Sequence, residues 1–116
     1  MLQRKLILDS EFKIDLIEIE KITYITVDSF SSEIHFVDGT KCNSSKTLSF
    51  LESSLPDTFF KISRNTIVNL SHIENVNKLS HKIKIEGDIA LCASTRQFKN
   101  LIKHLKRISV HKIINI

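Results

Sequence analysis

Two short segments concentrate side chains that can contact nucleic acid. In the first, residues 61–69, Lys61, Arg64, Asn65, Thr66 and Asn69 fall within nine residues. An arginine can donate two parallel hydrogen bonds to guanine, and asparagine or threonine can bind phosphate or base edges. The alternative is that both asparagines form turns. Because Asn69 lies inside an apolar run, a buried turn-forming role is the favoured prediction for it.

The second segment is residues 94–97, where Ser94, Thr95, Arg96 and Gln97 stand together at the expected start of a helix. Free backbone N–H groups at a helix start attract phosphate, and Arg96 would extend from there toward a groove. Ser94 and Gln97 also fit a capping box, so helix capping alone is the alternative for these two. No acidic residue lies near Arg64 or Arg96 in the sequence, which favours a functional role for both.

Catalytic and metal chemistry find little support in the sequence. The five histidines form no HExxH pattern, and Ser63, Ser71 and Ser94 lack a GxSxG context. Two glycines are too few for a glycine-rich phosphate loop. Cys42 and Cys92, fifty positions apart, indicate neither a zinc cluster nor a disulfide scaffold. We therefore expect no enzymatic activity, no cofactor and no metal.

The net charge of +4 is unevenly distributed. Residues 1–60 carry six basic and ten acidic side chains, a balance of −4, whereas residues 61–116 carry eleven and three, a balance of +8. This split fits a polyanionic partner for the second half, and it fits a solvated Lys-rich surface equally well. The apolar runs are short and the first residues lack a signal-peptide core, so we expect a soluble cytoplasmic protein without a membrane span.

The elements that must position these residues are mainly strands. A chain of 116 residues with 41% hydrophobic residues predicts a single domain over residues 1–116. Strands are predicted at 22–27, 34–37 and 40–43, with Asp38-Gly39 as a type I′ hairpin turn, and a second hairpin is predicted around Gly87-Asp88. The aromatic side chains are predicted to lie mostly in the core.

Two helices complete the predicted architecture. Leu48, Leu51 and Leu55 have helical spacing, which predicts a short helix over 46–55 that stops at Pro56. The last element has one apolar stripe flanked by lysines, formed by Phe98, Leu101, Ile102, Leu105 and Ile108. The sequence therefore predicts a strand-dominated domain closed by a basic amphipathic helix.

The segment FFKISRNTIVNLSHIENV, residues 59–76, resembles the signature of LytTR-type DNA-binding domains, the output modules of many bacterial response regulators. The matching residues are Phe60, Lys61, Ile62, Arg64, Ile67, Val68, Asn69 and Ile73. The elements around Tyr24, Asp38-Gly39, the middle helix and Arg96 follow in the family's order, so the resemblance covers about residues 10–108. Ser63, Asn65 and Thr66 depart from the family pattern.

The resemblance implies an elongated antiparallel β fold in which loops between strands, rather than a recognition helix, enter successive major grooves of double-stranded DNA. Carried over by position, base-reading residues are Arg64, Arg96 and Ser32, and backbone contacts come from Lys61, Asn65, Gln97, Lys99 and Glu33. The resemblance further implies transcription regulation, pairs of protomers on direct repeats, and a receiver or sensor domain that these residues do not include.

Two other function classes are weighed against sequence-specific duplex binding. One is a protein-interaction module whose basic face binds an acidic partner, with a weaker dependence on salt. The other is binding of single-stranded nucleic acid on a β surface, which uses exposed aromatic side chains for stacking. It ranks last because the aromatics are predicted to be buried.

Overall fold

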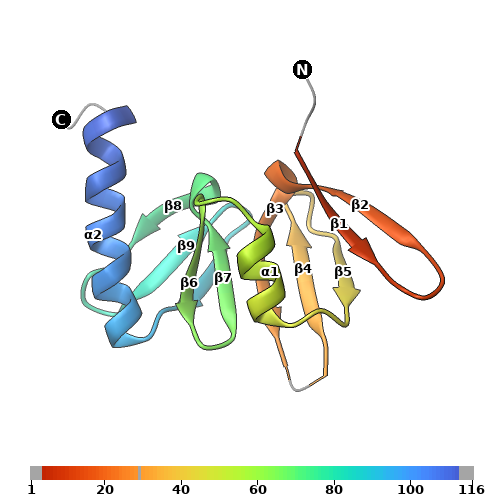
Figure 1. The fold of residues 1–116 in the computed structure, drawn as a ribbon. Helices are drawn as coiled ribbons and strands as arrows, with labels where there is room; N and C mark the ends of the chain where they lie inside the picture. Colours follow the sequence, from red (N-terminus) through yellow and green to blue (C-terminus); the bar gives the residue numbers. More distant parts are fainter. Residues whose placement is uncertain (1–3, 29, 113–116) are drawn as a thin grey trace.

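The protein folds into three antiparallel sheets and two helices, in a computed structural model that describes residues 4–28 and 30–112 (Figure 1). A two-stranded hairpin at one end consists of β1 (Lys5–Asp9) and β2 (Ile14–Glu18). The middle sheet has the order β5-β4-β3-β7-β6, with bounds Lys41–Ser44, Ser32–Phe36, Ile22–Val27, Thr66–Asn69 and Phe59–Ser63. The third sheet has the order β10-β9-β8, with bounds Ile89–Cys92, Lys82–Ile85 and Ile73–Val76.

The helices lie at different places in this arrangement. Helix α1 (Leu48–Ser54) joins β5 to β6 beside the middle sheet, and α2 (Thr95–Lys112) stands at the end opposite the β1–β2 hairpin (Figure 1). Single 3-10 turns, Ile19–Lys21 and Leu70–His72, precede β3 and β8. The described part is therefore mainly β, with a short middle helix and a C-terminal helix, as predicted.

Apolar side chains form one core on each face of the middle sheet. Neighbouring residues of a strand point to opposite faces, and the two central strands place Ile25 and Ile67 on one face and Tyr24 and Val68 on the other. The first face packs against the β1–β2 hairpin and α1, and the second against the third sheet and α2. The middle sheet is covered on both sides, so its loops and ends are left for contact with a partner.

The short middle helix begins and ends as the sequence predicts. The Thr47 hydroxyl accepts a hydrogen bond from the Phe50 N–H at 3.1 Å and caps the first turn. Leu51 is fully buried against the first core, and Leu55 leaves the helix with extended backbone directly before Pro56. The prediction of a helix within residues 46–55 is confirmed.

The first predicted hairpin turn differs from the type I′ form. That turn type needs positive φ at two residues, yet of Asp38 and Gly39 only Gly39 has one, at +88°. The Asp38 carboxylate instead accepts hydrogen bonds from the Thr40 N–H and hydroxyl, at 2.9 and 2.6 Å. The turn therefore has three residues between Phe36 and Thr40, because the aspartate stabilises negative φ at its own position.

The prediction that the aromatic side chains lie mostly in the core is wrong for three of them. Phe98 is buried, but Phe12 and Phe30 are each 91% exposed and Phe50 is 40% exposed. Phe12 and Phe30 lie in connections between strands, where alternation along a strand no longer determines the buried face. Strand β1 was also not predicted, although its alternation of buried Leu6 and Leu8 with exposed residues is regular.

Candidate nucleic-acid interface

Three connections lie along one edge of the protein, which we call the loop edge: residues 28 and 30–31 between β3 and β4, residues 63–65 between β6 and β7, and residues 93–97 before and in the first turn of α2 (Figure 1). Backbone hydrogen bonds tie them together. The Val27 N–H donates to the Asn65 carbonyl at 2.9 Å, and the Ser94 N–H donates to the Ile62 carbonyl at 2.9 Å. The relative positions of the three connections are therefore set by the main chain.

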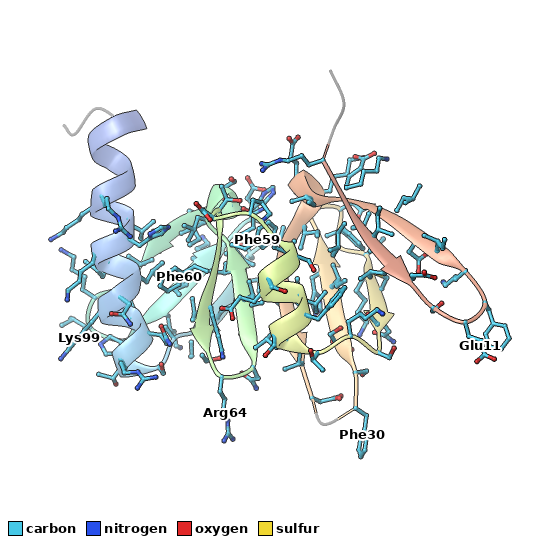
Figure 2. All side chains as sticks on the ribbon, in the orientation of Figure 1. Glu11, Phe30, Phe59, Phe60, Arg64 and Lys99 are labelled. Carbon is cyan, nitrogen blue, oxygen red and sulfur yellow. The ribbon has the colours of Figure 1, made fainter. Side chains whose placement is uncertain are left out.

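The β6–β7 turn presents Arg64 to solvent. Figure 2 shows this side chain extending beyond the turn, away from the sheets. It makes no hydrogen bond or ion pair with any residue that the structure describes. Asn65 forms the turn, since its amide oxygen accepts hydrogen bonds from the Ser63 hydroxyl at 2.8 Å and the Thr66 hydroxyl at 3.2 Å. The turn-forming interpretation of Asn65 is confirmed, and its amide nitrogen stays free to donate to a ligand.

Asn69, at the other end of β7, has the structural role predicted for it. Its side chain is 2% exposed, and its amide nitrogen donates to the Ile22 carbonyl at 2.8 Å. Its amide oxygen accepts from the Ser71 N–H at 3.0 Å and thereby holds the following 3-10 turn. Asn69 is therefore a buried residue whose side chain connects β7 to β3, and it is not part of the interface.

The start of α2 forms half of the predicted capping box. The Ser94 hydroxyl accepts a hydrogen bond from the Gln97 N–H at 3.2 Å, which caps the helix. The reciprocal bond is not formed because the Ser94 N–H is already donated to β6, and the Gln97 side chain faces Asn100 at 3.5 Å. Arg96 is exposed and has no partner among the described residues. The helix start thus offers free N–H groups and an unpaired guanidinium on one surface.

Lysines extend this positive surface beyond the two arginines. Lys99 is exposed on α2, one turn after Arg96 (Figure 2). Lys61 is half-buried on β6, opposite Ile67, and so faces the α1 side of the middle sheet. The ion pairs between described residues lie in three places. One group is on the β1–β2 hairpin and includes Lys21, one is on β4 and β5, and one is on the third sheet and includes His72. The basic residues of the loop edge are therefore not neutralised by neighbouring carboxylates.

Ser32, predicted to read bases, is not presented to solvent in this structure. Ser32 lies inside β4, fully buried, and its hydroxyl donates to the Ser44 carbonyl at 3.2 Å. Its neighbour Glu33 also lies in β4 rather than in a loop, and its carboxylate contacts Lys41 at 3.1 Å and His35 at 3.4 Å. The sequence predicted a strand only from residue 34, and the polar Ser32 gave no signal that β4 already begins at residue 32.

The first connection of the loop edge is instead formed by residues 28–31. The Asp28 carboxylate accepts hydrogen bonds from the N–H groups of Phe30 and Ser31, both at 2.9 Å, and these bonds lower the pKa of Asp28. Phe30 is 91% exposed and extends from the same edge as Arg64 (Figure 2). Sequence reasoning missed both residues, although an aspartate two and three residues before free N–H groups is typical of such a turn.

Three histidines have partners that the sequence did not indicate. The rings of His35, His81 and His104 stack on Tyr24, Phe98 and Phe60, with ring centroids 4.1, 4.4 and 5.4 Å apart. Burial lowers the pKa of His35, opposed by the Glu33 carboxylate beside it. Tyr24 and Phe60 pack against the core on the α2 side of the middle sheet, so these contacts give His35 and His104 a packing role there.

A family model described as the LytTr DNA-binding domain matches residues 13–106. The chain belongs to this family. The resemblance inferred from the residues around Arg64 is thereby confirmed, and the match lies entirely within the predicted range of about 10–108. The helices that the structure describes include none long and apolar enough to cross a membrane.

The same fold occurs in a solved structure. A domain from Bacillus cereus, described as the LytTr DNA-binding domain of a methyl-accepting/DNA response regulator, superimposes with a TM-score of 0.74. The two chains share 18% sequence identity, and the alignment covers 87% of this chain and 95% of the other. At this identity the similarity establishes the fold of this LytTr member. No curated protein matches the chain.

Proposed function

We propose that this LytTr domain binds double-stranded DNA in a sequence-specific manner to regulate transcription, with the loop edge entering successive major grooves. The observation that carries the proposal is the pair Arg64 and Arg96. Both are exposed and lack a partner among the described residues, and both extend from connections that main-chain hydrogen bonds hold together. Membership of a family of DNA-binding domains supports the same function.

The residues of the loop edge, together with Lys61 on β6 and Lys99 on α2, divide into two roles by their chemistry. Arg64 and Arg96 carry planar guanidinium groups that can donate two parallel hydrogen bonds to guanine, so we assign them to base recognition. The remaining contacts are to the sugar-phosphate backbone, which fix register and carry no sequence information directly. We assign these to Lys61, Lys99, Gln97 and the free amide nitrogen of Asn65. We assign no DNA contact to Ser32 and Glu33, because both lie within β4.

Separate alanine substitutions of Arg64 and Arg96 test base recognition. Each is expected to weaken binding to the preferred duplex by about 1–3 kcal/mol and to relax sequence preference. Fluorescence anisotropy with specific and random duplexes at two salt concentrations measures both effects. Arg4→Ala is the matched control, because Arg4 is exposed and lies next to β1, in a part of the chain outside the loop edge. Equal losses on specific and random duplex would refute base recognition.

The same titration distinguishes the other function classes. The titration includes a single-stranded competitor, because Phe30 is exposed on the loop edge and offers a ring on which a base can stack. Tighter binding of single strands, lost in Phe30→Ala, would replace the duplex proposal. No binding to either form would favour an acidic protein partner for the basic surface.

Paired protomers on direct repeats are the arrangement that the family resemblance implies. Selection of bound duplexes from a random pool tests it and identifies the target sequence. Two copies of one motif in the same orientation, with a fixed spacing, are the expected result. A single copy of the motif would mean that one protomer binds alone.

A further inference from the structure

The outer face of the β1–β2 hairpin is apolar and uncovered. Of the eight large apolar side chains that are exposed in the described part of the chain, five gather at this end: Ile7, Phe12, Ile14, Leu16 and Val37. Ile7 and Leu16 are direct cross-strand partners, so both point away from the core that lies beneath the hairpin. Exposed apolar surface of this extent typically marks a site of protein association.

The face has a protrusion at one end and a hollow at the other. Phe12, 91% exposed, lies in the turn at the tip of the hairpin, which a 2.9 Å hydrogen bond from the Ser10 N–H to the Lys13 carbonyl closes. Beside the opposite end of β2 is an open cavity of about 340 Å³, whose lining combines the apolar Leu16, Ile17, Phe36 and Val37 with the charged Glu18, Lys21 and Asp38. The Phe12 ring can fill the apolar part of such a cavity, but within one molecule the two lie at opposite ends of the hairpin.

From this arrangement we infer that the face binds a second copy of the chain. A twofold axis crossing the hairpin at Ile7 and Leu16 reverses the strand direction, so that the tip of each hairpin meets the cavity of the other. The same operation places Lys5 opposite Asp9 of the partner subunit, since these residues lie two positions on either side of Ile7 and point to the same face. Contacts that are complementary in both directions define an isologous interface.

Area and charge both support a second copy over other partners. A fully exposed side chain of this size presents roughly 150–200 Å², so the five exposed fractions correspond to roughly 500–600 Å², most of the ~800 Å² that each partner contributes to a standard interface. The charged rim is mixed, with the pairs Lys5–Glu18 and Lys21–Glu18 at 4.0 and 3.0 Å. A balanced rim around an apolar centre suits its own copy and does not suit a polyanion. The association uses a face outside the loop edge. It is a different contact from one between protomers on direct repeats, which have the same orientation along DNA and are not related by a twofold axis.

Sedimentation velocity without DNA, from about 1 to 100 μM protein, tests this inference. The unmodified chain is expected to be a dimer at the upper concentrations. Leu16→Glu and Phe12→Asp are each expected to raise the dimer dissociation constant about 30-fold or more, as for central apolar contacts of an interface. The control is Leu79→Glu, because Leu79 is 96% exposed but lies between β8 and β9. Circular dichroism confirms that each variant is folded.

Cross-linking tests the relative placement of the two copies. In a Cys42→Ser, Cys92→Ser background, Phe12→Cys and Val37→Cys proteins are mixed and treated with a short bifunctional thiol reagent. A mixed cross-linked pair that exceeds either self-pair is expected, because the hairpin tip faces the partner's cavity. A monomer at every concentration, an equal effect of Leu79→Glu, or the absence of the mixed pair would overturn the inference. Because no DNA is present, these outcomes are independent of the proposed DNA binding.

Discussion

Replacement of Asn69 by alanine is expected to destabilise the fold far more than its polar character suggests. The side chain is 2% exposed and joins two main-chain groups that have no other connection to each other, the Ile22 carbonyl at 2.8 Å and the Ser71 N–H at 3.0 Å. Alanine supplies neither the donor nor the acceptor. Both main-chain groups then lose a hydrogen bond, the Ile22 carbonyl in a buried place and the Ser71 N–H in a part-buried one.

The magnitude follows from these two bonds. A buried polar group left without a partner costs about 1–3 kcal/mol, so the free energy of unfolding of Asn69→Ala is expected to fall by about 2–4 kcal/mol. That is a large fraction of the total for a domain of this size. For 116 residues it corresponds to a decrease in Tm on the order of 10 °C.

Urea unfolding followed by far-UV circular dichroism measures the change, with Asn65→Ala as the matched control. Asn65 also accepts two hydrogen bonds, from the hydroxyls of Ser63 and Thr66, but it is exposed, so water replaces the lost partner. The control is expected to lose less than about 1 kcal/mol. Equal losses of unfolding free energy in the two variants, or a loss below about 1 kcal/mol for Asn69→Ala, would refute the structural role assigned to the buried Asn69 side chain.

Three further predictions concern a cation, a helix cap and a histidine. Lys99→Ala is expected to weaken binding to all duplexes similarly and to lower the slope of log binding constant against log salt by about one, as measured by anisotropy; a sequence-selective loss would contradict a phosphate contact. Thr47→Ala removes the cap of α1 and is expected to lower the free energy of unfolding by about 1 kcal/mol in urea, whereas Thr47→Ser should retain most of it. Burial lowers the pKa of His35, so the folded state binds this proton less readily than the unfolded state, and stability is expected to fall as the pH drops below 6.5. His35→Phe keeps a ring against Tyr24 without a titrating group, so its unfolding free energy should change less over the same pH range; an unchanged pH dependence would contradict the role of His35.

Periodicity and capping residues predicted the elements whose local signals agree with their packing. Leu48, Leu51 and Pro56 were enough for the middle helix, and Ser94 with the apolar stripe was enough for α2. Asn69 was also predictable, because an asparagine in an apolar run must satisfy its amide within the fold. The family resemblance added the elongated antiparallel β fold, which alternation along single strands does not contain.

Features that depend on partners distant in sequence were not predictable. Ser32 is buried because β4 pairs with both β3 and β5, and nothing near residue 32 shows that pairing. Phe12 and Phe30 are exposed because they lie in connections, although their side chains are typical of a core. The ring contact of His35 likewise depends on the pairing of β4 with β3, and those of His81 and His104 depend on the packing of α2.

The main-chain bonds that link the three connections of the loop edge affect how such a domain can change its target. Any residue except proline supplies the N–H of position 27 or 94, and every residue supplies the carbonyl of position 62 or 65. These two main-chain bonds do not involve the side chains of Arg64 and Arg96, so substitutions at positions 64 and 96 leave the bonds in place. Under the proposed base recognition, random variation at positions 64 and 96 should yield altered DNA preferences at little loss of folding stability. The loop edge is therefore a suitable place to engineer binding to a different DNA sequence.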